Sequence, residues 1–414
     1  MKSIFAINEP YISPEYYENL RNYKYLSNDS SLTYKYIMSP LCNNLVTIFP
    51  IWLAPNVITV SGFFLNLVYF IVENYYTKFK GGYIPPWACF FSAICYLVYQ
   101  VLDNIDGKQA RRTNSSSALG LLVDHGTDSC TTFFITCGLG AILGLTTIHQ
   151  YILLWIMIIV PFYLNNWEQY VTGKMDLPFI NGINEGTYII FYLESLSGIK
   201  SQDFLINNKC YIFNKEVQLN TFMSSIACCA GVFFGMLSVI KIIMNENCKK
   251  KLSALLDIFP FVFFLMTFFV VVYVSNSLYV VEYPQFIILT FGLQFSKMLG
   301  LLQLSHLTKG RFNPYNFSFL FPNLLLIFHS LIYFWTKKEK IFNLSIDNLI
   351  MLFFVYNFFI WIHFAYFCSE ELCVILNINR FSLKKRNTDN NDNKLEQLNQ
   401  RKQKEKIINN NLSK

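Results

Sequence analysis

Four aspartates lie in one short stretch of an otherwise apolar chain: Asp103, Asp106, Asp124 and Asp128. Residues three or four apart share one face of a helix, so each neighbouring pair points to one side. Two helices joined by the polar turn 113–117 would bring all four carboxylates to one place. Carboxylates this close repel one another unless protons or cations neutralise them. Because oxygen ligands suit hard divalent ions, the spacing predicts a site for Mg2+ or Mn2+.

Two glycines flank these acids. Gly107 follows Asp106 directly, and Gly120 lies one turn before Asp124. Without a side chain, each would let a polyphosphate substrate or a neighbouring helix approach the backbone. The alternative is ordinary packing, since small residues are common in membrane helix bundles.

The composition identifies the elements that must position these residues. The chain has 414 residues, of which 53% are hydrophobic and 14% are charged, unlike the balance of a soluble enzyme. We therefore predict an all-α fold, a polytopic transmembrane helix bundle. About ten apolar segments are long enough to be candidate spans: 56–74, 86–110, 114–145, 148–170, 186–197, 221–244, 255–276, 284–306, 315–336 and 346–374.

Three regions follow from this pattern. Residues 1–50 form an N-terminal cytosolic or interfacial segment, in which the aromatic and basic stretch 20–50 predicts an amphipathic helix lying in the membrane interface. Residues 51–376 form the transmembrane catalytic domain. Residues 377–414 are a basic, Asn- and Lys-rich tail that we predict to be disordered and cytosolic.

The net charge of +7 lies mainly in loops and at the ends of the chain. This distribution favours contact with anionic membrane lipid and argues against nucleic acid as a partner. Placing the turn 113–117 in the cytosol puts most of the basic loops there too, so we expect the active site to face the cytosol.

The aspartate stretch resembles the signature of the CDP-alcohol phosphatidyltransferase family. The signature reads Asp-x-x-Asp-Gly-x-x-Ala-Arg, eight residues, then Gly-x-x-x-Asp-x-x-x-Asp, and residues 103–128 match it at every fixed position. The segments 52–56 and 106–113 and the triplet Asp124-His125-Gly126 are similar to those of its ethanolamine and choline phosphotransferase subgroup.

This resemblance implies an integral membrane enzyme of the endoplasmic reticulum, usually a homodimer. It would transfer phosphoethanolamine or phosphocholine from CDP-ethanolamine or CDP-choline to diacylglycerol, with release of CMP. The four aspartates would hold two metal ions. The CDP-alcohol would lie against Asn56, Gly107, Ala110, Arg111 and Gly120, and Lys108 could add a point charge.

Two residues are candidates for the general base. The resemblance implies Asp128 in the family at large and His125 in the choline and ethanolamine enzymes. A metal-bound carboxylate is a weak base, whereas a histidine titrates near neutral pH. We therefore favour His125 as the catalytic base and keep Asp128 as the alternative.

One position departs from the family pattern. Similar enzymes usually carry Gly-Glu-Leu-Phe-Asp, but this chain has Leu121 in place of the acidic residue. The choice between ethanolamine and choline therefore stays open. Glu168 or Glu185 could replace the missing carboxylate, and Trp167 or Tyr170 could bind an ammonium group through their rings.

Other classes of protein remain to be weighed. A divalent-cation transporter would also gather carboxylates at membrane depth, but it does not need the glycines, Ala110 and Arg111 at fixed intervals. A catalytically inactive scaffold would not need all four aspartates. Within the family, an enzyme that uses CDP-diacylglycerol with inositol or glycerol phosphate is the nearest alternative.

Overall fold

The computed structural model describes residues 10–179, 181–182, 184–212, 214–245, 251–313, 317–338, 340–341, 343–385 and 394–400. These residues are nearly all helical. The helices are a 3-10 turn Pro14–Tyr16, α1 Tyr17–Arg21, a π-helical turn Tyr34–Met38, α2 Ser39–Leu45, α3 Pro55–Thr77, α4 Pro86–Arg112, α5 Ala118–Ile142, α6 Ile148–Thr172, α7 Asn184–Lys200, α8 Asp203–Asn207, α9 Leu219–Met244, α10 Lys251–Leu256, α11 Phe259–Val274, α12 Leu278–Glu282, α13 Pro284–Thr308, α14 Phe317–Thr336 and α15 Ile346–Leu376.

The described residues also form three two-stranded β-sheets in the segments between helices. Strand β1 (Ser27–Asp29) pairs in parallel with β2 (Met175–Leu177), which ties the N-terminal segment to the end of α6. Strands β3 (Lys209–Ile212) and β4 (Lys215–Gln218) form a hairpin, as do β5 (Lys340–Ile341) and β6 (Leu344–Ser345).

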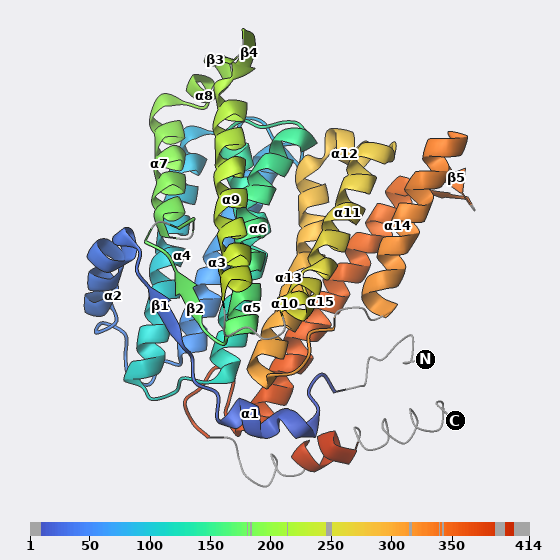
Figure 1. The fold of residues 1–414 in the computed structure, drawn as a ribbon. Helices are drawn as coiled ribbons and strands as arrows, with labels where there is room; N and C mark the ends of the chain where they lie inside the picture. The colour runs from blue at the N-terminus through green and yellow to red at the C-terminus, as the bar shows by residue number, and fades with distance from the viewer. Residues whose placement is uncertain are drawn as a thin grey trace, which may run out of the picture.

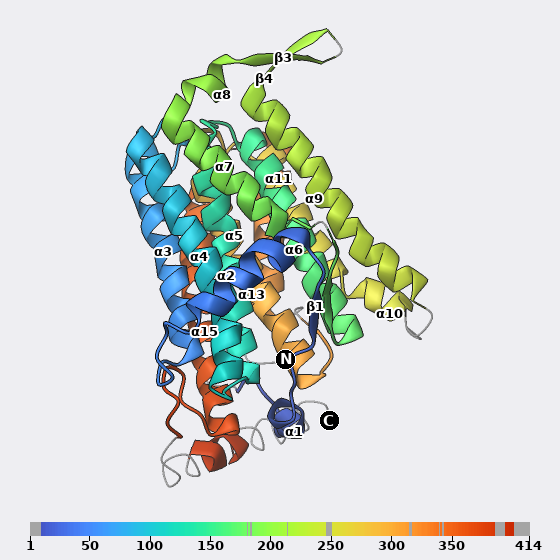
Figure 2. The ribbon, with the colours of Figure 1, turned by 90° about the vertical axis from the view of Figure 1, so that its left-hand side faces the viewer.

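The long helices run side by side and form one bundle (Figures 1 and 2). Helices α3, α4 and α5 pack against one another, and α7 packs on α4. Helix α13 lies at the centre, where it contacts α5, α6 and α15. In its most apolar stretch 83% of the residues are buried, compared with 22% in α9, which covers the outside of α6. The β3–β4 hairpin lies at one end of the bundle and α1 at the other.

The structure confirms an all-α polytopic membrane bundle. Eight helical segments have the length and composition of membrane spans: α3, α4, α6, α9, α10 with α11, α13, α14 and α15. The predicted spans 114–145 and 186–197 correspond to α5 and α7, which are not among the eight. Helix α5 carries the polar residues of the aspartate stretch, and α7 has only 17 residues. The count of ten spans therefore stays a prediction.

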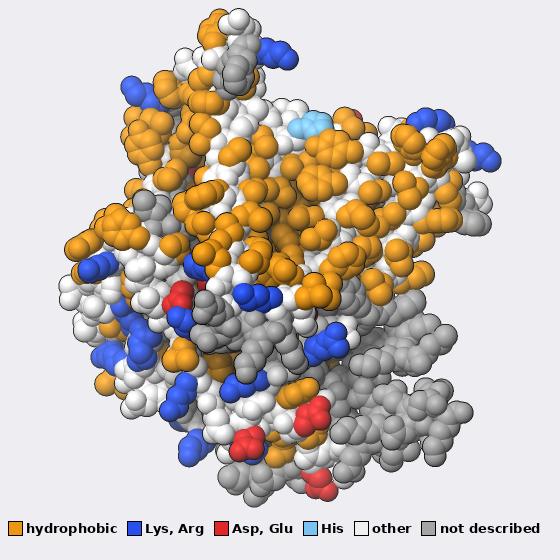
Figure 3. All heavy atoms as spheres, in the orientation of Figure 1, with side chains coloured by type: hydrophobic (Ala, Val, Ile, Leu, Met, Phe, Trp, Pro, Cys, Tyr) orange, Lys and Arg blue, Asp and Glu red, His pale blue; other side chains and the backbone are white. Residues whose placement is uncertain are grey.

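The surface separates an apolar zone from a charged zone. In Figure 3 hydrophobic side chains cover the part of the bundle that holds α9, α11 and the upper part of α14, and most of the Lys and Arg side chains lie below this zone. Basic residues bordering an apolar zone are typical of a membrane interface. The turn between α4 and α5 is at this lower end (Figure 1).

The N-terminal segment contains a helix in the predicted region, formed by the π-helical turn 34–38 and α2. Three apolar side chains on it, Tyr36, Ile37 and Leu41, are exposed, and α2 packs against α4. The interfacial position of this helix stays a prediction. The predicted tail begins with residues 377–385, which are folded back so that Ile378 bridges to Lys385. Residues 386–393 and 401–414 lie outside the described residues.

Candidate active site

The turn between α4 and α5 has the predicted form. Helix α4 ends at Arg112 and α5 begins at Ala118, four residues later than predicted. Ser117 explains this start, because its side-chain oxygen caps the helix by accepting a hydrogen bond from the Gly120 backbone N–H at 3.2 Å. The two helices therefore bring their aspartates to the same end of the bundle.

Three of the four carboxylates converge closely. One carboxylate oxygen from each of Asp103, Asp106 and Asp124 lies within 4.8 Å of the others. Asp128 follows Asp124 by one turn of α5, so its side chain leaves the same face of that helix. Within the described residues no salt bridge reaches any of the four. An all-oxygen donor set without a protein counter-charge fits hard divalent cations.

Two hydroxyl groups hold the carboxylates in place. Thr59 of α3 donates a short hydrogen bond to Oδ2 of Asp106, a residue that is only 7% exposed. Tyr99 of α4 donates to Oδ1 of Asp128 at 2.6 Å. Neither hydroxyl was predicted from the sequence. Such partners orient metal-ligand side chains and restrict the positions that their oxygens can take.

His125 is buried on α5 between the two aspartates of that helix. Its Nδ1 lies 2.7 Å from Oδ1 of Asn166 on α6. The Asn166 amide orientation is fixed because its Nδ2 donates to the Phe162 carbonyl at 2.7 Å. Oδ1 must therefore face His125, and since it can only accept, Nδ1 carries the proton. The other ring nitrogen, Nε2, then has a lone pair and can accept a proton.

A further amide supports this arrangement. Gln303 of α13 donates through Nε2 to Oδ1 of Asn166. The same nitrogen also donates to Oε1 of Gln169 at 3.2 Å. Asn166, Gln169 and Gln303 are all buried. One signal in the sequence could have identified these residues, since amide side chains are unusual inside apolar segments. It did not indicate that they meet behind His125.

The residues predicted to contact the CDP-alcohol lie at the same end of the bundle. Asn56, in the first turn of α3, is buried, and a Cβ atom added at Gly120 would lie 3.8 Å from its Oδ1. A Cβ atom at Gly107 would lie 3.6 Å from Nη1 of Arg111, whose side chain is exposed. Ala110 is partly buried one turn from Gly107.

Asn56 has a partner that the sequence did not predict. Its Nδ2 donates to the backbone carbonyl of Arg380 at 2.9 Å. The segment just after α15, assigned to a disordered tail from the sequence, thus contacts a residue that we expected beside the substrate.

Lys108 does not face the carboxylates. Its Nζ donates to Oδ1 of Asn43 at 2.8 Å and to Oγ of Ser39 at 3.2 Å, both on α2. Arg112 acts similarly, because its Nη1 donates to the Phe49 carbonyl at 2.6 Å. The idea that Lys108 supplies a point charge to phosphate is therefore not supported, because Lys108 holds α2, and Arg112 the segment after it, against α4.

The carboxylates suggested as replacements at the head-group site have other partners. Leu121 is buried in an apolar cluster. Glu168 forms a salt bridge with Lys241 at 3.2 Å. Glu185 accepts a hydrogen bond from the Thr33 hydroxyl at 3.0 Å. Neither glutamate is thus an unpaired acid that could take the place of the one missing at position 121.

The two aromatic candidates are also used elsewhere. Trp167 is fully buried, and its Nε1 donates to the Ala254 carbonyl at 2.9 Å. The Tyr170 hydroxyl donates to the Gly310 carbonyl at 3.3 Å. Both rings fix neighbouring segments to α6, so the structure gives no support to a role in binding an ammonium group.

Comparison with known proteins agrees with this site. Residues 52–165 match the sequence pattern of the CDP-alcohol phosphatidyltransferase family. Choline/ethanolaminephosphotransferase 1 of Arabidopsis thaliana is 32% identical over 302 residues, which cover 70% of this chain and 76% of the relative. Ethanolaminephosphotransferase 1 of Homo sapiens is 38% identical over 212 residues, or 48% of this chain and 53% of the relative.

A third relative extends the similarity over most of the sequence. A CDP-alcohol phosphatidyltransferase class-I family protein of Dictyostelium discoideum is 30% identical over 386 residues, which cover 90% of this chain and 96% of the relative. The matched segment 52–165 contains the carboxylate cluster and His125. Together, the site and the relatives show that the chain belongs to the CDP-alcohol phosphatidyltransferase family.

Proposed function

We propose that this protein transfers phosphoethanolamine, phosphocholine or both from the CDP ester to diacylglycerol. The products are phosphatidylethanolamine or phosphatidylcholine and CMP. The proposal is carried by the carboxylate cluster of α4 and α5, which lies beside a histidine with an available Nε2. The names of the relatives, choline/ethanolaminephosphotransferase and ethanolaminephosphotransferase, support the same reaction.

The carboxylates of Asp103, Asp106, Asp124 and Asp128 would hold two divalent ions, Mg2+ or Mn2+. Ions bound there would supply positive charge that stabilises the phosphate oxygens during displacement and the CMP that leaves. The protein's own part is to fix the oxygens that bind these ions. Thr59 does this for Asp106, and Tyr99 does so for Asp128.

His125 would act as the general base. The diacylglycerol hydroxyl gives its proton to Nε2 while its oxygen forms a bond to the phosphorus that carries the alcohol. The bond between that phosphorus and the CMP oxygen breaks. Asn166 keeps the proton on Nδ1, so that Nε2 stays available, and it stabilises the imidazolium once formed. Asp128 remains the alternative base.

The nucleotide side of the substrate would lie against Asn56, Gly107, Ala110, Arg111 and Gly120. Arg111 is exposed and close to Gly107, so its guanidinium group can turn to a phosphate without leaving a buried partner. The glycines leave backbone accessible at two positions near the carboxylates.

Two alternatives are less well supported. A family member that uses CDP-diacylglycerol with inositol or glycerol phosphate is not favoured, because the relatives are named for choline and ethanolamine transfer. A divalent-cation transporter would explain the carboxylates but not the oriented histidine behind them.

We further propose the setting in which the enzyme acts. The protein would be a homodimer in the endoplasmic reticulum membrane, with its active site facing the cytosol. Residues 1–50 would be the interfacial segment, residues 51–376 the catalytic domain and residues 377–414 the cytosolic tail. The basic residues at the active-site end of the surface support the cytosolic orientation (Figure 3).

The experiment is a competition assay with the purified full-length protein. CDP-ethanolamine and CDP-choline are offered together with diacylglycerol and Mg2+ or Mn2+, and the lipid products are separated. We expect at least one of the two phospholipids, together with an equal amount of CMP. Formation of neither phospholipid, with CMP released only when CDP-diacylglycerol and inositol or glycerol phosphate are supplied, would overturn the proposal.

A further inference from the structure

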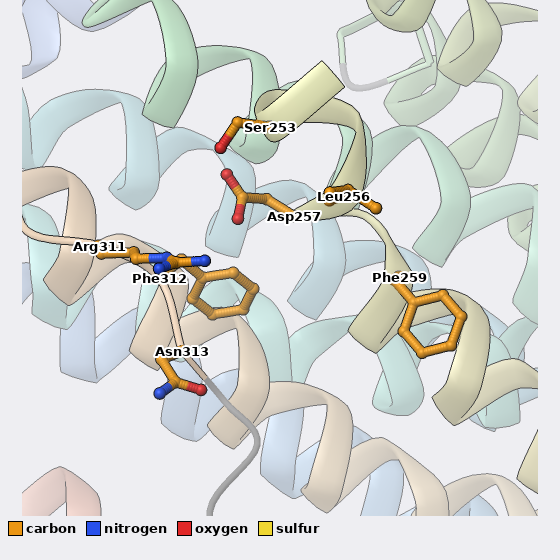
Figure 4. A pocket seen from close by; sticks show the side chains of 7 residues that line it. All are labelled: Ser253, Leu256, Asp257, Phe259, Arg311, Phe312 and Asn313. Atoms are coloured by element: carbon orange, nitrogen blue, oxygen red, sulfur yellow. The ribbon is translucent and has the colours of Figure 1, made fainter. Parts of the chain in front are cut away.

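A cavity of about 480 Å3 lies outside the carboxylate site, between the corner that joins α10 to α11 and the segment that follows α13 (Figure 4). Ser253, Leu256, Asp257 and Phe259 line one wall, and residues 311–313 line the other. The cavity is at the active-site end of both helices, where α13 also carries Gln303.

The two walls carry opposite charges. The carboxylate of Asp257 and the guanidinium group of Arg311 face the same space from opposite sides (Figure 4). Across the described residues, neither side chain takes part in a salt bridge or a side-chain hydrogen bond. The rings of Phe259 and Phe312 add apolar surface. The cavity therefore offers an anion site, a cation site and an apolar border.

Helix α6 fixes both walls. Tyr163 donates to the Asp257 carbonyl at 3.2 Å, and Trp167 holds the same wall through Ala254. The Tyr170 hydroxyl lies 3.0 Å from the Phe312 backbone nitrogen on the other wall. These three α6 residues are four and three apart and share one face of the helix, next to the strip that holds Asn166. Contacts from α6 thus hold both walls of the cavity in place.

An exposed apolar stripe begins at the cavity. Phe259, Val262 and Met266 are 55%, 51% and 47% exposed, and their spacing of three and four puts them on one face of α11. Leu256, at the end of α10, is 62% exposed beside them. Hydrophobic side chains cover this part of the bundle in Figure 3. In a membrane this stripe would face lipid acyl chains.

We propose that the cavity binds the head group of a zwitterionic glycerophospholipid. Arg311 contacts the phosphate, Asp257 contacts the ammonium group, and the acyl chains lie along the stripe on α11. Arginine suits phosphate because its planar fork offers paired donors. Diacylglycerol offers no charged group to either side chain, and a lipid with only negative charge would face Asp257. This inference rests on the proposed function in one respect, since the proposed ligand belongs to the same lipid class as the reaction products. Binding of the lipid to the cavity does not require turnover.

The test is native mass spectrometry of the full-length protein in detergent, titrated with one lipid at a time. An Asp106→Asn background removes turnover from the measurement, so that the result does not depend on the proposed reaction. We expect phosphatidylcholine and phosphatidylethanolamine to bind more tightly than phosphatidylglycerol or diacylglycerol. Arg311→Gln should weaken phosphatidylcholine binding about 10-fold or more, since a hydrogen bond to a charged group is lost.

The matched control is Lys309→Ala, which removes a nearby positive charge that does not line the cavity. It should bind phosphatidylcholine as the parent does. Asp257→Asn keeps the shape of the side chain and should reduce the preference for phosphatidylcholine over phosphatidylglycerol, a change that a general loss of stability would not produce.

The same phospho-alkylammonium chemistry is present in CDP-choline and in glycerophosphocholine, so both are added as competitors. We expect neither to displace the bound lipid at equal concentration, because they lack acyl chains. Displacement by CDP-choline, equal binding of phosphatidylglycerol and phosphatidylcholine, or unchanged binding by Arg311→Gln and Asp257→Asn would each overturn the proposal.

Discussion

Replacing Asn166 by Ala tests whether His125 is held as a base. The change removes the acceptor of the His125 Nδ1 proton, which lies 2.7 Å from Oδ1 in a buried setting. An unsatisfied buried donor costs about 1–3 kcal/mol. If that bond strengthens as the imidazolium forms, the loss appears in the barrier, and kcat falls about 5- to 150-fold.

The assay measures CMP release at saturating CDP-ethanolamine and diacylglycerol, with thermal unfolding recorded for every variant. Asn165→Ala is the matched control, because the neighbouring amide accepts from Ser238 of α9 at 2.8 Å and does not reach His125. It should keep nearly the full kcat. The KM for the CDP-alcohol should change little in either variant, since Asn166 contacts the base and not the nucleotide.

A double-mutant cycle with His125→Ala completes the test. His125→Ala alone should lower kcat on the order of 10²- to 10⁴-fold if this residue is the base. Adding Asn166→Ala should then cost little more, because Asn166 acts through His125. Fully additive losses would refute the claim that Asn166 acts through His125. A near-normal kcat for His125→Ala would shift the role of the base to Asp128.

Three further predictions concern the carboxylates. Asp106→Asn should abolish turnover while the protein stays folded and monodisperse in detergent, and retained activity would rule out the metal assignment. Thr59→Val, which keeps the side-chain shape but removes the hydrogen bond to Asp106, should reduce activity about 10- to 100-fold; a titration with Mg2+ should show a raised metal requirement, and an unchanged titration curve would count against the role of Thr59. Removal of divalent ions with EDTA should stop CMP release, and Mg2+ or Mn2+ should restore it; full activity in excess chelator would contradict a metal-dependent reaction.

Much of the fold could be predicted from local patterns. Each of the ten predicted apolar segments overlaps a helix, because a run of apolar residues needs only its own backbone hydrogen bonds to be stable in a membrane. The convergence of the aspartates followed from helical spacing and one short turn. Helix α5 began later than predicted because Ser117, not the first polar residue of the turn, caps it.

The partners of the site residues could not be predicted in the same way. Asn166 is 41 residues from His125 and on another helix, so no local spacing links them. Thr59 reaches the site from α3 and Arg380 from the segment after α15, and again no local spacing links them to their partners. Only the packing of the bundle brings such residues together.

The departure at Leu121 illustrates a different limit. From the sequence it appeared as a missing acid at the head-group site, which suggested nearby replacements. In the structure Leu121 packs in an apolar cluster, and Glu168 is paired with Lys241. A residue type alone does not say which neighbours its side chain meets.

The most direct test of the central claim is Mn2+ binding measured by electron paramagnetic resonance on the purified protein. If the carboxylates of α4 and α5 hold two ions together, the wild-type protein should bind two Mn2+ per chain with a spin-coupled spectrum, and Asp103→Asn should lose that coupling. No bound Mn2+, or a coupled spectrum that survives Asp103→Asn unchanged, would contradict the account.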